Sequence, residues 1–151
     1  QPTQTDPKGF RDKAMLETMY ATGIRVTELI DLNVDDVNLE LGIIKCISGN
    51  KSRTIPLYPA ALSAIASYIS NVRAGMLADP EEKALFVNVS GTRMSRQGFW
   101  KIIKHYAEMA GINPSLMRQY TSGVTNAGQK QYDKIRVAVE KISKELSAAT
   151  F

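Results

Sequence analysis

The chain has 151 residues, of which 44% are hydrophobic and 23% are charged, and its formal net charge is +4. This composition suits one domain with a packed core and argues against disordered, collagen-like and low-complexity chains. No stretch approaches the roughly eighteen consecutive apolar residues of a membrane span, and residues 1–9 lack the apolar core of an export signal. The single cysteine, Cys46, and the single histidine, His105, argue against disulfides and metal clusters, so we expect a cytoplasmic protein that holds no metal.

The charges are unevenly distributed along the chain. Residues 10–41 carry seven acidic and three basic side chains, whereas residues 42–58 carry three basic side chains and no acid. Residues 91–111 carry four basic side chains against one acid, and residues 112–151 carry six against three. This pattern predicts one positive face that attracts a polyanion, most commonly nucleic acid; the alternative is an ordinary solvated surface.

The first half of the chain predicts two helices and a hairpin. Residues 1–9 have the pattern of a linker or arm, a helix begins near Phe10 and ends before Gly23, and a short helix covers about residues 26–32. Arg25 therefore lies in the bend between two helices, where unpaired N–H groups favour a nearby phosphate. Residues 43–47 and 53–57 predict two strands joined by a turn at residues 48–50, with Lys51 and Arg53 at or near its tip.

The second half predicts a helix at about residues 60–72, a loop over 74–83 and a short strand over 84–89. Ser95 can cap a helix that runs to about Ala110, with its basic residues mostly off the apolar face. Residues 117–129 have the composition of a loop. The segment of about residues 131–147 predicts an amphipathic helix that packs on this domain or on a partner.

Three segments carry a family resemblance. They are residues 11–29 (RDKAMLETMYATGIRVTEL), residues 49–57 (GNKSRTIPL), and Leu85-Phe86 followed by residues 94–106 (MSRQGFWKIIKHY) and 110–112 (AGI). In order and spacing they resemble the catalytic domain of tyrosine recombinases, the Xer-type recombinases and phage integrases, whose signatures read RDKAML…YATGxRxSEL and GKGNKERxVPL. The resemblance covers about residues 8–116. It implies an α+β fold that is mostly α-helical with a small antiparallel sheet of about three strands.

The resemblance also implies a chemistry. In this family a tyrosine hydroxyl attacks a DNA phosphate and forms a 3′-phosphotyrosyl link, with no metal, cofactor or small-molecule substrate. Arginines clamp the phosphate oxygens and a hairpin lysine protonates the leaving oxygen. Arg25 matches the first arginine, although a salt bridge to Glu28 or Asp31 is the structural alternative. Lys51 is the nearest hairpin lysine, but the turn is one residue shorter than in the family, so a general acid and a plain backbone contact remain equal alternatives.

The expected partners are double-stranded DNA and other recombinase subunits. Arginine and glutamine side chains at a helix start can read base edges in the major groove, or they can contact phosphates or water only. Arg53 fits a structural or phosphate-positioning role, Trp100 fits the core, and His105 fits the surface or a cap. The residues expected to face DNA are Lys45, Arg53, Arg93, Ser95, Arg96, Gln97, Lys101 and Lys104.

The resemblance ends after Met117. The family's His-x-x-Arg motif would place its histidine at Tyr120 and its arginine at Gly123, and neither Tyr120 nor Tyr132 lies in the family's nucleophile context. The domain map is therefore residues 1–9 as an arm, 10–116 as a partial catalytic domain, and 117–151 as a divergent loop and helix. We expect the chain to bind DNA without cleaving it alone. The alternatives are a non-catalytic DNA-binding regulator and a protein–protein module that docks through its terminal helix.

Overall fold

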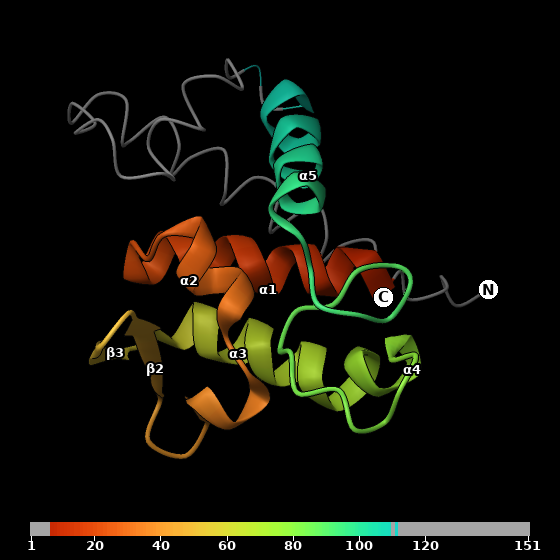
Figure 1. Cartoon of the computed structure of the whole chain (residues 1–151). Coiled ribbons are helices and arrows are strands. Elements are labelled where there is room, and N and C mark those ends of the chain that lie inside the picture. Colours follow the sequence, from red (N-terminus) through yellow and green to blue (C-terminus); the bar gives the residue numbers. More distant parts are fainter. Residues whose placement is uncertain (1–6, 110, 112–151) are drawn as a thin grey trace.

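The computed structural model describes residues 7–109 and 111, and these residues form a mostly helical fold with one small sheet (Figure 1). The predicted loop at 117–129 and the predicted helix at 131–147 lie outside the described residues. The helices are α1 (Pro7–Thr22), α2 (Val26–Asp31), η1 (Val34–Asp36, 3₁₀), α3 (Pro59–Tyr68), η2 (Ile69–Arg73, π), α4 (Ala74–Met76) and α5 (Arg96–Met109); the strands are β1 (Val37–Asn38), β2 (Ile43–Ser48) and β3 (Lys51–Pro56).

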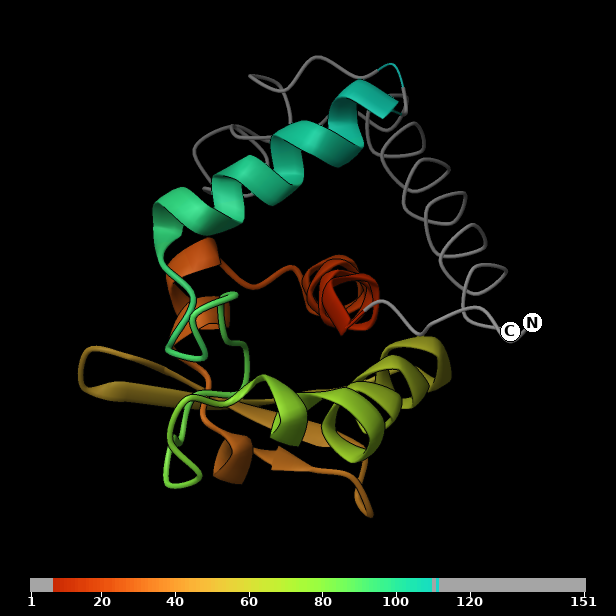
Figure 2. The same ribbon diagram turned by 90° about the vertical axis from the view of Figure 1, so that its right-hand side faces the viewer.

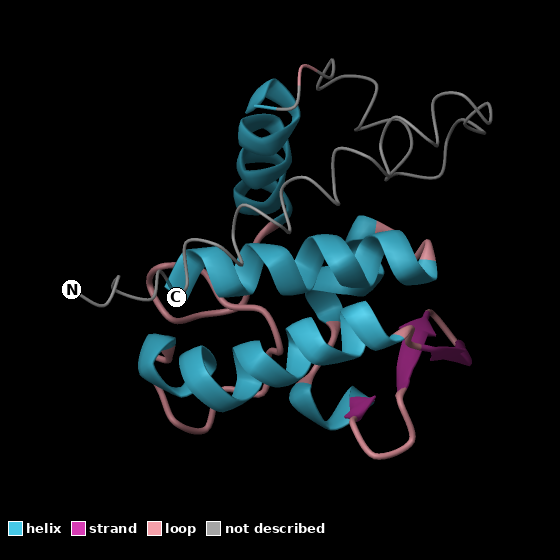
Figure 3. Cartoon of the chain, turned by 180° about the vertical axis from the view of Figure 1, so that it is seen from behind, coloured by secondary structure: helices cyan, strands magenta, loops and turns pink. Residues whose placement is uncertain are grey.

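Helix α1 is the centre of the arrangement. Helix α3 runs antiparallel to it on one side, and α5 crosses it steeply on the other, so that α1 is seen end-on between them in Figure 2. The three strands gather at the end of the α1–α3 pair where α1 finishes and α3 begins (Figure 3). Fully buried side chains from all three helices, including Met15, Ile65 and Phe99, fill the space between them.

The sheet is antiparallel in the order β1-β2-β3, which confirms the α+β fold and the predicted β2–β3 hairpin. The third strand is not where the sequence placed it. It is β1, a two-residue strand after η1, which pairs Val37 with Ile44 and Asn38 with Ile43. A segment this short between polar residues carries too little alternation to be recognised from the sequence.

The segment predicted as a strand over residues 84–89 makes only isolated bridges, Asn33 with Ala84 and Val87 with Arg93. It is nevertheless completely buried from Ala84 to Val87. Side chains take the place of a neighbouring strand: the Tyr68 hydroxyl donates to the Leu85 carbonyl at 2.7 Å, and Arg73 donates to the Ala84 carbonyl at 2.6 Å. Because these donors satisfy its buried carbonyls, the segment needs no strand partner on that side.

The helical run after Pro59 is longer than predicted. It continues through the π turn η2 and through α4 to Met76, so residues 74–76 are helical and the predicted loop begins only after them. The π turn leads to Arg73, whose buried guanidinium also donates to the Glu82 carbonyl at 2.7 Å. The first helix likewise begins at Pro7, three residues before its predicted start.

Candidate DNA interface

Arg25 lies in the predicted bend between α1 and α2. Helix α1 ends where Gly23 takes φ 65° and its N–H donates to the Met19 carbonyl at 2.9 Å. Only glycine adopts this left-handed conformation without strain, so the chain turns there. Arg25 is then extended (φ −74°, ψ 155°) as the N-cap of α2, and it is exposed. Its guanidinium therefore stands at a helix start, open to solvent.

Glu28 joins this bend to the hairpin. Its side chain is only 6% exposed, and its Oε1 accepts a hydrogen bond from the Arg25 backbone N–H at 3.0 Å. The same carboxylate accepts from Nη2 of Arg53 in β3, at 3.0 Å to Oε1 and 3.3 Å to Oε2. Glu28 therefore pairs with Arg53, which occupies the position that the structural alternative gave to Arg25.

The hairpin presents its cations at a tight turn. Ser48 pairs with Lys51, so Gly49 and Asn50 alone form the turn, and Gly49 has φ 61°. A glycine with positive φ at the first central position suits a two-residue hairpin. Lys51 is the first residue of β3 and lies at the tip as predicted, and it is exposed. Lys45, in β2 opposite Thr54, is exposed further along the hairpin.

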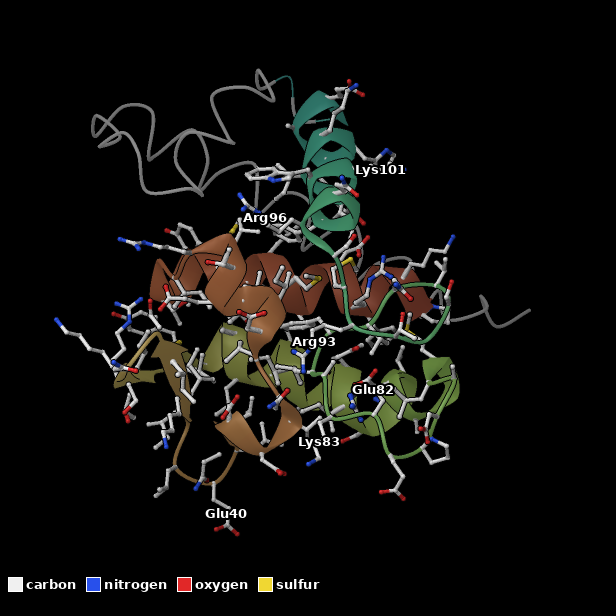
Figure 4. All side chains as sticks on the ribbon, viewed as in Figure 1. Glu40, Glu82, Lys83, Arg93, Arg96 and Lys101 are labelled. Atoms are coloured by element: carbon white, nitrogen blue, oxygen red, sulfur yellow. The ribbon has the colours of Figure 1, made fainter. Side chains whose placement is uncertain are left out.

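Helix α5 begins as predicted, because the Ser95 Oγ accepts a hydrogen bond from the Gly98 N–H at 2.9 Å and so caps its first turn. Arg96 is exposed in that turn. Gln97, Lys101 and Lys104 follow at a spacing of four and three residues, which places them on one stripe of the helix. All three are exposed, and Figure 4 shows Lys101 projecting from the side of α5.

The side chain of Arg93 is bound by the protein itself. This side chain is half-buried and turns into the molecule, where its Nη1 donates to the carbonyls of Ile30 at 2.8 Å and Leu32 at 3.2 Å (Figure 4). Its Nη2 donates to Oδ1 of Asn33. A guanidinium held by three acceptors of the protein fastens the segment just before α5 to the end of α2.

Two other expectations for α5 are confirmed. Trp100 is half-buried and packs against the hydrophobic core, with its ring centroid 6.2 Å from that of Phe99. His105 is exposed, and its ring lies edge-on to Tyr106 with 5.1 Å between centroids.

Sequence reasoning missed a set of buried charged residues. Arg11, Asp12 and Arg73 are less than 10% exposed, and their contacts join segments that are distant in the sequence. Arg11 and Asp12 stand within the recognised motif of residues 11–29, whereas no local signal distinguishes Arg73 from a surface arginine. In residues 7–109 and 111, no three His, Cys, Asp or Glu side chains gather around a possible metal position. No described helix has the length and apolarity that a bilayer crossing requires.

Comparison with known proteins places the chain in a family. The sequence profile of the phage integrase family matches residues 1–122. The tyrosine recombinase XerD of Staphylococcus epidermidis is 47% identical over 116 residues, which cover 76% of this chain and 39% of that protein. The tyrosine recombinase XerC of Herpetosiphon aurantiacus is 40% identical over 132 residues, covering 84% of this chain and 43% of that protein.

Comparison with solved structures leads to the same family. The XerA recombinase has a TM-score of 0.59 at 25% identity, over 95% of this chain and 59% of that one. XerH, solved with its difH substrate before cleavage, has a TM-score of 0.60 at 18% identity, over 94% of this chain and 43% of that one, which shows a shared fold. The chain spans about two fifths of the length of the curated relatives it matches. It belongs to the phage integrase family, with Xer-type tyrosine recombinases as its relatives, which confirms the resemblance seen in the sequence.

Proposed function

We propose that this chain is the DNA-holding part of a site-specific tyrosine recombinase and that it does not cleave DNA alone. The observation that carries the proposal is the exposed Arg25 at the start of α2, joined through Glu28 to the hairpin that carries Lys51. A guanidinium beside helix N–H groups and further cations favours a phosphate strongly.

The proposed contact surface has three parts. Arg25 clamps a backbone phosphate, and the hairpin contacts the strand through Lys45, Lys51 and the exposed side of Arg53. The start and exposed stripe of α5 lie in or along the groove. These residues are Ser95, Arg96, Gln97, Lys101 and Lys104. Phosphate contacts fix the position of the protein, whereas Arg96 and Gln97 have the donor and acceptor geometry to read base edges.

Two features support a loss of cleavage: the missing His-x-x-Arg motif, and the absence of the family's nucleophile context around Tyr120 and Tyr132. Gly123 stands at the position of the family's second arginine and supplies no charge to a phosphate. One preorganised hydrogen-bond donor typically stabilises the transition state by about 3 kcal/mol, which corresponds to more than a hundredfold in rate. Lys51 directly follows the shortened hairpin turn, and both of its roles, general acid and backbone contact, stay open within the proposal. We also keep other recombinase subunits as partners, and the cytoplasm as the expected compartment.

Duplex binding at several salt concentrations tests the proposal. Each phosphate contact adds about 0.9 to the slope of log affinity against log salt, which is about eightfold in affinity for every tenfold dilution of salt. Arg25→Ala is expected to lower the slope by about 0.9 and to leave folding unchanged. Lys83→Ala is the matched control, because Lys83 is also exposed but lies at the end of the molecule away from α5 (Figure 4).

The outcomes separate the alternatives. Binding that does not depend on salt, or that Lys83→Ala weakens as much as Arg25→Ala does, would contradict the proposed surface and favour a protein–protein module. Unfolding of Arg25→Ala would make Arg25 a structural residue. A covalent adduct with a nicked recombination-site duplex would show that the chain cleaves DNA after all.

A further inference from the structure

A buried hydrogen bond joins α5 to α1. The Tyr106 hydroxyl of α5 donates to Oδ2 of Asp12 at 2.9 Å, across 94 residues of sequence. Asp12 is 6% exposed and Tyr106 is 9% exposed. A hydrogen bond to a buried carboxylate is stronger than one between neutral groups, because the surroundings screen it less. The bond therefore fixes the distance between the two helices at this point.

Asp12 is itself held rigidly. Its Oδ1 accepts from Nε of Arg11 at 3.0 Å and from Nη2 at 2.9 Å, and Nη1 of Arg11 donates to the Val87 carbonyl at 3.2 Å. Both Arg11 donors hold the one oxygen Oδ1, which leaves Oδ2 to accept the hydrogen bond from Tyr106.

The start of α5 has a separate attachment. Arg93 binds the carbonyls at the end of α2, just before α5 begins. Tyr106 comes ten residues after Arg96, which is about 15 Å along a helix. Phe99, Ile103 and Ala107 pack α5 against the core along its length, and the Tyr106–Asp12 bond adds a directional contact near its far end.

We propose that Asp12 and Tyr106 are a positioning pair, which sets the direction of α5 so that its exposed cations and Arg25 meet one DNA duplex together. The inference rests on the proposed function. Helix α1 is common to both parts of the surface, because it carries Asp12 near its start and ends three residues before Arg25. With α5 already fixed, binding does not have to order it, so each phosphate contact keeps its full contribution.

Tyr106→Phe tests the pair, since it removes the hydroxyl alone. The variant is expected to fold. Its salt slope of duplex binding is expected to fall by about 0.9, because a phosphate contact at Lys101 or Lys104 is lost; this corresponds to about eightfold in affinity per tenfold dilution of salt. Trp100 gives a second measurement, because it is the only tryptophan of the chain and lies half-buried on α5. Its emission is expected to shift to longer wavelength as the helix loosens.

Tyr68→Phe is the matched control. It removes the hydroxyl of another buried tyrosine, which donates to the Leu85 carbonyl at 2.7 Å and lies outside α5. It is expected to lower stability while leaving the salt slope and the Trp100 emission unchanged. Equal effects of the two variants, or unfolding of Tyr106→Phe, would overturn the positioning role. If the wild type shows no salt-dependent binding, the proposed function fails, and an unshifted Trp100 emission in Tyr106→Phe would then also overturn the pair.

Discussion

Removing the Glu28 carboxylate tests whether this one side chain holds the bend and the hairpin together. Glu28→Ala leaves the Arg25 N–H without its 3.0 Å acceptor and releases Arg53 from its ion pair. Arg53→Ala removes only the second of these interactions. Glu81→Ala, at an exposed glutamate, is the control for the loss of one surface charge.

The two interactions differ in expected strength. A hydrogen bond to a charged group contributes about 1.5–3 kcal/mol. The Arg53 side chain is 54% exposed, so solvent screens its ion pair and limits it to about 0–1 kcal/mol. We therefore expect Glu28→Ala to lower the free energy of unfolding by about 2–3 kcal/mol, and Arg53→Ala by less than about 1 kcal/mol. Glu81→Ala should stay within about 0.5 kcal/mol.

Urea unfolding of the wild type, both single variants and the double variant measures these values and their coupling. A coupling of more than about 2 kcal/mol between Glu28 and Arg53 would show that the pair behaves as a buried one and would refute the screening argument. An Arg53→Ala variant as unstable as Glu28→Ala would refute the dominant role assigned to the backbone bond.

Three further predictions concern buried groups. Burial is the main cause, and the nearby Glu28 carboxylate the second, of a pKa of the Cys46 thiol above its ordinary value of 9.0. Thiol reagents should therefore modify the native protein far more slowly than the unfolded protein. Equal rates of modification would contradict the burial. Burial also raises the pKa of Tyr68 to about 12, so stability should decline as the pH rises from 10 to 12; phenolate absorbance and thermal unfolding would detect this, and an equal decline in Tyr68→Phe would exclude Tyr68 as the cause. Gly91→Ala should cost more than about 2 kcal/mol in a denaturant titration, because φ is 81° and the new Cβ would lie 2.2 Å from the backbone nitrogen of Ala78, whereas Gly75→Ala meets no atom within 4 Å and should be tolerated.

The sequence was informative where structure is determined locally. Gly23 marked the end of α1, Ser95 the start of α5, and the turn around Gly49 the hairpin, because each signal acts within a few residues. The position of Arg25 in the bend followed from Gly23 together with the short helical pattern of about residues 26–32.

Contacts between distant segments could not be predicted in this way. Arg93 has the same sequence context as a surface arginine. Only the folded chain shows that carbonyls at the end of α2 accept hydrogen bonds from its guanidinium. The apolar run over 84–89 resembles a strand, but Tyr68 and Arg73 satisfy its carbonyls from a helix that precedes it. The ion pair between Glu28 and Arg53 spans 25 residues and was equally invisible to local patterns.

The buried run from Ala84 to Val87 determines how the molecule comes apart. Its carbonyls accept hydrogen bonds from Arg11 in α1, Tyr68 in α3 and Arg73 in η2. Its Leu85 amide donates a hydrogen bond to the Leu32 carbonyl at 2.9 Å. None of these helices can leave without breaking its hydrogen bond to this common backbone. Residues 7–109 should therefore lose their structure in a single cooperative step, with the Leu85 amide among the last to exchange its hydrogen.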